Sequence, residues 1–147
     1  VKDCGVRVYP VGRLDRDSEG LLLFTNDGAL TQRLLHPSHQ VDKVYMVSVS
    51  GADEGSAGRL RAVTSLDGQP IAPAQVDELY RRGDRAEYRV VIHQGKKRQI
   101  RRMCAAVGLT VTRLCRIAEG GLELGALPPG RWRYLTAGEL ESIKGSD

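Results

Sequence analysis

Residues 12–28 form a loop, an apolar run and a turn, and this segment constrains the fold of the chain more than any other. Gly12 and Gly20 bracket a polar loop that contains arginine, three carboxylates and a serine. Glycine adopts backbone conformations that other residues avoid, so the two glycines predict a tight loop. The apolar run at 20–25 predicts a buried strand, and the three residues after it predict a turn.

Asp15 is the candidate catalytic residue of this loop. A carboxylate beside an arginine, on a loop anchored by a buried strand, suits a catalytic acid or nucleophile. The alternative is a loop or capping aspartate. Asp17 and Glu19 are expected to hold the loop through local hydrogen bonds or to face solvent. The three carboxylates could instead bind Mg²⁺ in a metal-dependent phosphodiesterase, although no supporting carboxylate cluster occurs elsewhere.

Composition predicts one soluble domain. The chain has 147 residues, of which 41% are hydrophobic and 27% charged, so it can bury a real core. It contains neither a run of 18 apolar residues nor an export signal, and we expect a cytoplasmic protein with no membrane contact. Cys4, Cys104 and Cys115 lack metal-type spacing. The last two are expected to be buried, which fits a reducing compartment.

Positive charge is concentrated in one stretch of the chain. The net charge is +4, and no acidic residue lies between Glu87 and Glu119. Arginine grips phosphate at two points, which favours a nucleic-acid partner over a solvated basic face. The stretch contains eight basic residues: Arg89, Lys96, Lys97, Arg98, Arg101, Arg102, Arg113 and Arg116.

The remaining patterns predict an α+β fold on a largely antiparallel sheet. Strands are expected at 7–11, 20–25, 43–50, 75–80, 85–93, 109–117, 122–124 and 132–135. Helices are expected at 29–35, 54–66 and 98–107, and from a capping box at 136–139 to about residue 144. Asn26 or Asp27 is the expected cap of the first helix.

Three segments resemble motifs of the pseudouridine synthases, particularly the RsuA/RluB/RluE/RluF-type branch that modifies ribosomal RNA. The first is Gly12-Arg13-Leu14-Asp15 with the residues up to Gly28, and it resembles the catalytic motif. The others are Asp42-Lys43-Val44-Tyr45 and the segment 94–104, whose sequence most resembles the RluF type. Residues 111–133 also match the C-terminal pattern of this branch.

The resemblance implies a twisted, mainly antiparallel sheet with flanking helices and a central catalytic cleft. It implies that Asp15 is the catalytic residue, that Tyr45 lies in the active site, and that Arg13 contacts RNA around a flipped nucleotide. Tyr45 could stack on uracil or relay a proton, or it could be a half-buried core residue. No cofactor or metal is required. Family members usually begin with an S4-type RNA-binding domain, which the 14 residues before Asp15 do not contain, so we expect residues 1–147 to be the catalytic domain.

Basic residues are assigned from their positions. Arg101 borders the apolar face of its predicted helix, and we expect it to reach into the cleft and keep Asp15 ionised. The alternative for Arg101 is a surface arginine, and Lys43 is as readily a solvated strand-end residue as a phosphate contact. Further RNA contacts are expected from Lys43, Lys96, Lys97, Arg98 and Arg102.

The predicted function is isomerisation of a uridine in ribosomal RNA, by a monomer that acts on the RNA or on a pre-ribosomal particle. The large subunit is favoured over the small one. A non-catalytic RNA-binding module is the alternative. Whether Asp15 attacks C1′ or removes the 2′ proton is left open by the sequence.

Overall fold

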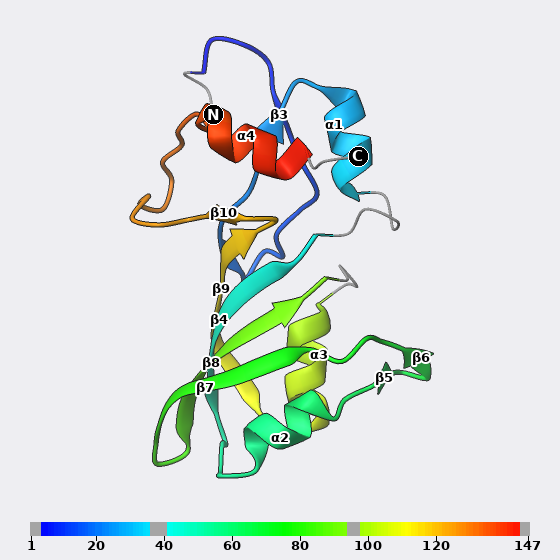
Figure 1. Ribbon diagram of the computed structural model, residues 1–147. Coiled ribbons are helices and arrows are strands. Elements are labelled where there is room, and N and C mark those ends of the chain that lie inside the picture. Colours follow the sequence, from blue (N-terminus) through cyan, green and yellow to red (C-terminus); the bar gives the residue numbers. More distant parts are fainter. Residues whose placement is uncertain (1–3, 36–40, 94–97, 145–147) are drawn as a thin grey trace.

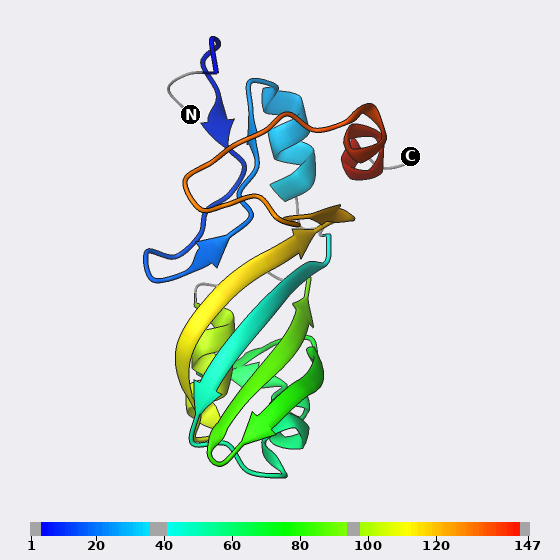
Figure 2. The ribbon, with the colours of Figure 1, turned by 90° about the vertical axis from the view of Figure 1, so that its left-hand side faces the viewer.

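A twisted sheet with the strand order β10-β9-β4-β8-β7 organises the molecule (Figures 1 and 2). The computed structural model describes residues 4–35, 41–93 and 98–144. Neighbouring strands on this path are antiparallel, which confirms the predicted α+β class with a mainly antiparallel sheet. The five strands are β4 (Lys43–Ser50), β7 (Gln75–Arg82), β8 (Arg85–Ile92), β9 (Thr110–Glu119) and β10 (Leu122–Glu123).

The central strand β4 has the bounds that its alternating pattern predicts. Val47 and Val49 are almost fully buried in the main hydrophobic cluster, and Tyr45 packs against the same cluster from the same face. Val44 is buried on the opposite face. Met46 and Ser48, on the same face as Val44, are only half-buried, so the main core lies on the face of Val47 and Val49.

Two helices cover one face of the sheet beside β7 and β8 (Figure 1). They are α2 (Ser56–Arg61) and α3 (Gln99–Ala106). The apolar residues Ile100, Met103 and Cys104 of α3 are buried, as its helical spacing predicts. Cys104 and Cys115 are both buried free thiols, which also confirms the prediction.

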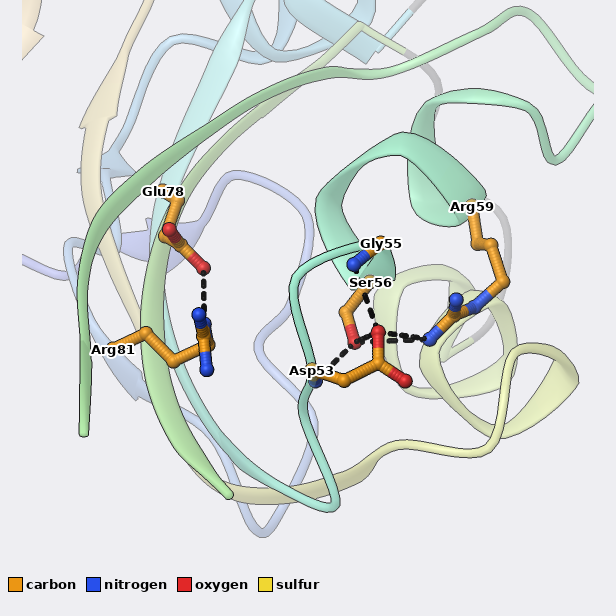
Figure 3. Close-up of polar contacts among 6 residues, drawn as sticks. All are labelled: Asp53, Gly55, Ser56, Arg59, Glu78 and Arg81. Carbon is orange, nitrogen blue, oxygen red and sulfur yellow. Dashed lines mark hydrogen bonds and ion pairs between the residues drawn. The ribbon is translucent and has the colours of Figure 1, made fainter. Parts of the chain in front are cut away.

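Asp53 anchors the start of α2, as Figure 3 shows. Its Oδ1 accepts hydrogen bonds from the backbone N of Gly55 and from Nη2 of Arg59, both at 2.8 Å. Ser56 Oγ accepts one from the backbone N of Asp53, also at 2.8 Å. The same view contains an ion pair on β7 between Glu78 and Arg81, 3.6 Å apart.

The other two helices lie beyond the sheet end formed by β10 (Figure 1). Asp27 caps α1 (Gly28–Leu35) by accepting from the N atoms of the second and third residues of α1, at 3.0 and 3.1 Å. Thr136 and Glu139 form the predicted capping box of α4 (Ala137–Lys144), with reciprocal bonds of 2.9 and 3.1 Å. Both predicted caps are confirmed. No helix in the described ranges is long and apolar enough to cross a membrane.

Four predicted elements need correction. The strand at 20–25 is wrong, because only its ends pair: β2 (Glu19–Gly20) runs parallel to β9, and β3 (Phe24–Thr25) pairs with β1 (Tyr9–Pro10). The short strand β1 replaces the longer strand that was expected at 7–11.

The helix expected at 54–66 is shorter, since its last two residues form β5 (Ser65–Leu66), which pairs with β6 (Gln69–Pro70). Residues 132–135 form no strand. There, Arg133 pairs with Glu139 of α4 at 2.7 Å, and the rings of Trp132 and Tyr134 meet edge to face.

Candidate active site

The loop that carries Asp15 is closed at both ends by backbone contacts. The backbone N of Val11 donates to the carbonyl of Leu23 at 2.7 Å, and Ser18 N donates to Asp15 O at 2.9 Å. Gly12 has φ +73° and Gly20 has φ +114°, so both glycines adopt the conformations that the sequence predicts. The loop is therefore a tight turn held against its own return segment.

Gly20 brings the end of this loop against β9. It pairs in parallel with Arg116, and Leu21 N donates to the carbonyl of Arg116 at 2.8 Å. A Cβ atom at Gly20 would lie 2.5 Å from the backbone N of Arg116 and closer still to its carbonyl oxygen. Only glycine allows the two backbones to approach this closely.

Ion pairs to distant arginines hold the loop in place. Arg98 donates to both carboxylate oxygens of Asp17 at 3.0 and 2.9 Å, and Arg113 donates to both oxygens of Glu19 at 2.9 and 3.2 Å. These hydrogen bonds lower the pKa of each carboxyl group below its ordinary value. Asp17 and Glu19 thus hold the loop, as predicted, but through residues more than 80 positions away rather than through local hydrogen bonds.

A cleft of about 570 Å³ opens beside this loop. It lies between two hydrophobic clusters: Val11 belongs to one and Ile100 to the other, and both line the cleft. Asp15 and Tyr45 line the same cleft, so the structure brings these two predicted residues together. Its polar lining comes from Arg13, Asp15, Ser18, Lys43, Tyr45, Arg98, Gln99, Arg116 and Glu119.

Asp15 contributes an available carboxylate to this cleft. Among the residues that the structure describes, its side chain forms no hydrogen bond and no ion pair. Its negative charge nevertheless acts on the phenol of Tyr45 and on the guanidinium of Arg98. The carboxylate therefore shares the cleft with both groups and is hydrogen-bonded to neither.

Two cross-strand pairs from β4 and β9 form one wall of the cleft. Lys43 lies opposite Glu119, and Tyr45 lies opposite Arg116. Arg116 and Glu119 are only 4% and 7% exposed. Nε of Arg116 donates to the backbone carbonyl of Leu21 at 2.8 Å and lies 3.8 Å from a carboxylate oxygen of Glu119. The side chain of Arg116 is thus fixed from two sides.

A β-bulge explains why Arg116 and Glu119 share this wall. The register of β9 against β4 shifts between Val44 and Tyr45, so that Ile117 has no partner on β4. Without the extra residue, positions three apart on a strand would point to opposite faces. The bulge places both charged side chains in the cleft.

Burial and neighbouring charges shift the pKa values of this wall in opposite directions. Burial raises the pKa of the Tyr45 phenol, and the Arg116 guanidinium partly offsets that rise. Burial lowers the pKa of the Lys43 ammonium, while Glu119 acts to raise it. Lys43 is half-buried in the cleft rather than a solvated strand-end residue.

The expected pairing of Arg101 with Asp15 is wrong. Arg101 Nη2 donates to the backbone carbonyl of Asp17 at 2.6 Å, and its Nε lies 3.4 Å from a carboxylate oxygen of the same residue. Because Asp17 captures this guanidinium, Arg101 acts on the loop and does not line the cleft. The cations that line the cleft with Asp15 include Arg98 and Arg116.

Of the other predicted RNA-contacting residues, some line the cleft and others do not. Arg13 lies at the cleft with an exposed side chain, while Arg102 pairs with Asp67 outside the cleft lining. The predicted RNA contacts Lys96 and Lys97 lie outside the described residues.

Sequence reasoning missed three buried polar residues of the cleft: Gln99, Arg116 and Glu119. One signal was available for Arg116, which interrupts an apolar strand pattern. No group of three or more histidine, cysteine or acidic residues within the described ranges could hold a metal ion. Asp17 and Glu19, the other proposed metal ligands, are engaged by arginines.

The family model and the similar proteins all indicate the same family. Residues 3–106 match the family described as RNA pseudouridylate synthase. An uncharacterized RNA pseudouridine synthase of Aquifex aeolicus is 40% identical over 97% of this chain and 58% of its own length. The ribosomal large subunit pseudouridine synthase E of Xanthomonas campestris is 41% identical over 86% of this chain and 76% of its own length. The corresponding enzyme B of Bacillus subtilis is 36% identical over 97% of this chain and 60% of its own length.

A solved structure supports the same fold. A crystal structure of pseudouridylate synthase superposes with a TM-score of 0.82 at 31% identity, covering 92% of this chain and 59% of that one. The predicted pseudouridine-synthase fold is therefore confirmed. The chain spans a little over half the length of several relatives that it matches. On sequence and structure together, the chain belongs to the RNA pseudouridylate synthase family.

Proposed function

We propose that this chain is the catalytic domain of a synthase that converts a uridine of large-subunit ribosomal RNA to pseudouridine, with Asp15 as the catalytic carboxylate. The observation that carries the proposal is the Asp15 carboxylate, which shares a cleft with Tyr45 and has no hydrogen bond or ion pair to a described residue. The names of the Xanthomonas and Bacillus relatives favour the large subunit. We further propose that the protein acts as a monomer in the bacterial cytoplasm, on the RNA or on a pre-ribosomal particle.

The reaction needs a carboxylate rather than a cofactor. The bond between C1′ and N1 of uracil breaks, the base turns, and a bond forms between C1′ and C5. The C5 proton leaves and N1 gains a proton, so that no oxidant or reductant is consumed. An ionised Asp15 could attack C1′ as a nucleophile or remove the 2′ proton as a base.

Tyr45 and the basic residues are assigned supporting roles. The ring of Tyr45 offers a stacking surface for uracil, and its hydroxyl could take part in proton transfer. A base must leave its helical stack to reach a cleft of this kind, because C1′ and C5 are shielded in a duplex. Arg13, exposed at the cleft, is suited to contact the phosphates around the extruded nucleotide.

The remaining expected assignments stay proposals, and of the described residues among them Arg98 lines the cleft whereas Arg101 and Arg102 do not. Lys96 and Lys97 are proposed to contact RNA phosphate, because they belong to the stretch between Glu87 and Glu119 that contains no acidic residue. Arg101 is proposed to act as a positioning residue through Asp17. Arg98 and Arg102 are proposed to contact RNA phosphate with guanidinium groups whose positions are set by ion pairs with Asp17 and Asp67.

Release of tritium from C5-labelled uridine in ribosomal RNA tests the proposal. The wild-type protein should release tritium from large-subunit RNA without added metal or nucleotide. Asp15→Asn, which preserves the side-chain shape, should lower kcat by about 10⁴-fold or more while RNA retention changes little. Asp77→Asn on β7 is the matched control and should leave kcat unchanged.

The outcome distinguishes the remaining alternatives. Tritium release by Asp15→Asn at the wild-type rate would remove Asp15 from the mechanism. Salt-dependent RNA retention with no tritium release at any protein concentration would identify a binding module instead. Release from small-subunit RNA alone would reassign the substrate, and loss of release on adding a chelator would favour metal chemistry.

A further inference from the structure

Three buried side chains of the cleft, those of Gln99, Arg116 and Glu119, have hydrogen-bonding atoms that no described residue satisfies. The unsatisfied atom of Glu119 is Oε2, an acceptor that lies 3.8 Å from Arg116 Nε. Gln99 is 3% exposed, and neither its Oε1 nor its Nε2 has a partner. Arg116 is 4% exposed, and its Nη2 has none. Buried polar atoms are nearly always paired in native proteins. Since these side chains line the cleft that holds Asp15, the unpaired atoms of Gln99 and Arg116 point to a ligand with both donor and acceptor groups.

The fold holds both groups in position. Gln99 opens α3 directly after Arg98, whose backbone adopts the left-handed conformation with φ 53° and ψ 33°. The side chain of Arg98 is fixed by its double contact with Asp17. Arg116 is held through its Nε by the carbonyl of Leu21, so its Nη2 is a donor of fixed direction. A conformation that L-residues rarely adopt, maintained at a cleft, is typical of functional sites.

We propose that Gln99 reads the N3 edge of the target uracil, and that Arg116 donates a hydrogen bond to a carbonyl beside it. This inference rests on the proposed function. Uracil presents a carbonyl, an N–H and a second carbonyl along this edge. Oε1 of Gln99 can accept from the N3–H group while its Nε2 donates to one neighbouring carbonyl. Nη2 of Arg116 supplies the donor for the other carbonyl.

The symmetry of this edge suits a base that must turn during the reaction. A half-turn about the line through N3 and C6 exchanges C5 with N1, and it also exchanges the two carbonyl groups. N3–H stays in place, so the same carboxamide and guanidinium can hold the base before and after the turn. Cytosine lacks this symmetry, because its N3 carries no proton and an amino group replaces one carbonyl. In one of the two orientations that amino group would face the donor of Arg116.

Gln99→Leu separates recognition from folding. Leucine has similar volume and no polar atoms, so replacing a buried unpaired amide should leave the melting temperature unchanged or raise it. Tritium release should nevertheless fall by about 10- to 100-fold in kcat/KM, as expected for loss of one or two hydrogen bonds. Gln75→Leu, on β7 and exposed, is the matched control and should alter neither quantity.

A modified substrate tests the N3 contact directly. Single-stranded oligouridylate should shift the side-chain amide signals of Gln99 in a nitrogen–proton NMR spectrum, and N3-methylated oligouridylate should shift them much less. Wild-type protein should prefer the unmodified strand by about 10-fold in affinity, and Gln99→Leu should bring that ratio close to one.

The outcomes keep the two proposals apart. A wild-type protein that releases no tritium refutes the proposed function, whereas the NMR comparison needs no turnover. Equal amide shifts from both strands, or full tritium release by Gln99→Leu, would overturn the role of Gln99. A lower melting temperature with an unchanged N3-methyl preference would show that Gln99 is structural only.

Discussion

Replacing Gly20 with alanine would test whether the loop that carries Asp15 depends on its close approach to β9. The backbone of Gly20 has φ +114°, which costs an L-residue about 1–3 kcal/mol. The new Cβ would also overlap the backbone of Arg116, so the two segments must separate. Separation breaks the bond from Leu21 N to the carbonyl of Arg116 and the bond from Arg116 Nε to the carbonyl of Leu21. At about 1 kcal/mol for each bond, the total loss is about 3–5 kcal/mol.

Urea unfolding of Gly20→Ala should therefore show a midpoint far below that of the wild type, with reduced tritium release even in the folded fraction. Gly83→Ala is the matched control, since Gly83 also has positive φ, +61°, but its Cβ would meet nothing within 4 Å. That variant should lose only about 1–2 kcal/mol and keep its activity. Equal losses in the two variants would refute the argument from close approach and leave backbone strain as the whole effect.

Three further predictions concern charged groups. Asp17→Asn should lower tritium release by about 10- to 100-fold with little change in stability, because the pair with Arg98 is solvent-exposed and positions the loop; wild-type kcat would contradict this. Glu119→Gln should move the basic limb of the pH–rate profile to lower pH, since the Glu119 carboxylate raises the pKa values of Lys43 and Tyr45; an unshifted profile would exclude this coupling. In the folded chain, hydrogen bonds from Arg133 lower the pKa of Glu139 to about 2, from an ordinary value of 4.5. Stability from this pair is complete above pH 4.5 and is lost as the pH falls toward 2, so Glu139→Gln should flatten the acid-unfolding curve across that window.

Sequence patterns correctly predicted the helix caps and strands that are determined by residues close together in the chain. The alternation at Lys43–Ser50 has the bounds of β4, and the capping residues Asp27 and Thr136 make the bonds that their sequence context indicates. The hairpin of β7 and β8 was also visible, because a short glycine turn separates two alternating runs. These features depend on a few neighbouring residues, so they can be recognised without a structure.

Features that depend on distant backbone were not visible in the sequence. The apolar run at 20–25 looked like one strand, but Gly20 turns it toward β9 while its other end pairs with β1. The wall formed by Arg116 and Glu119 was missed because the bulge at Ile117 breaks the two-residue period of the strand. Arg101 was assigned to Asp15 from a helical wheel, which cannot distinguish two carboxylates in the same loop.

The three carboxylates of that loop have different partners, and this difference is what leaves Asp15 available. Asp17 is bound by two guanidinium groups and Glu19 by a third, which together fix the loop against α3 and β9. Asp15 lines the cleft, and its carboxylate has no partner among the described residues. If Arg98 or Arg101 paired with Asp15 instead, the loop would lose an anchor and the carboxylate its freedom to meet a substrate. The ion pairs of the loop therefore support catalysis by binding the neighbours of the proposed catalytic residue and not the residue itself.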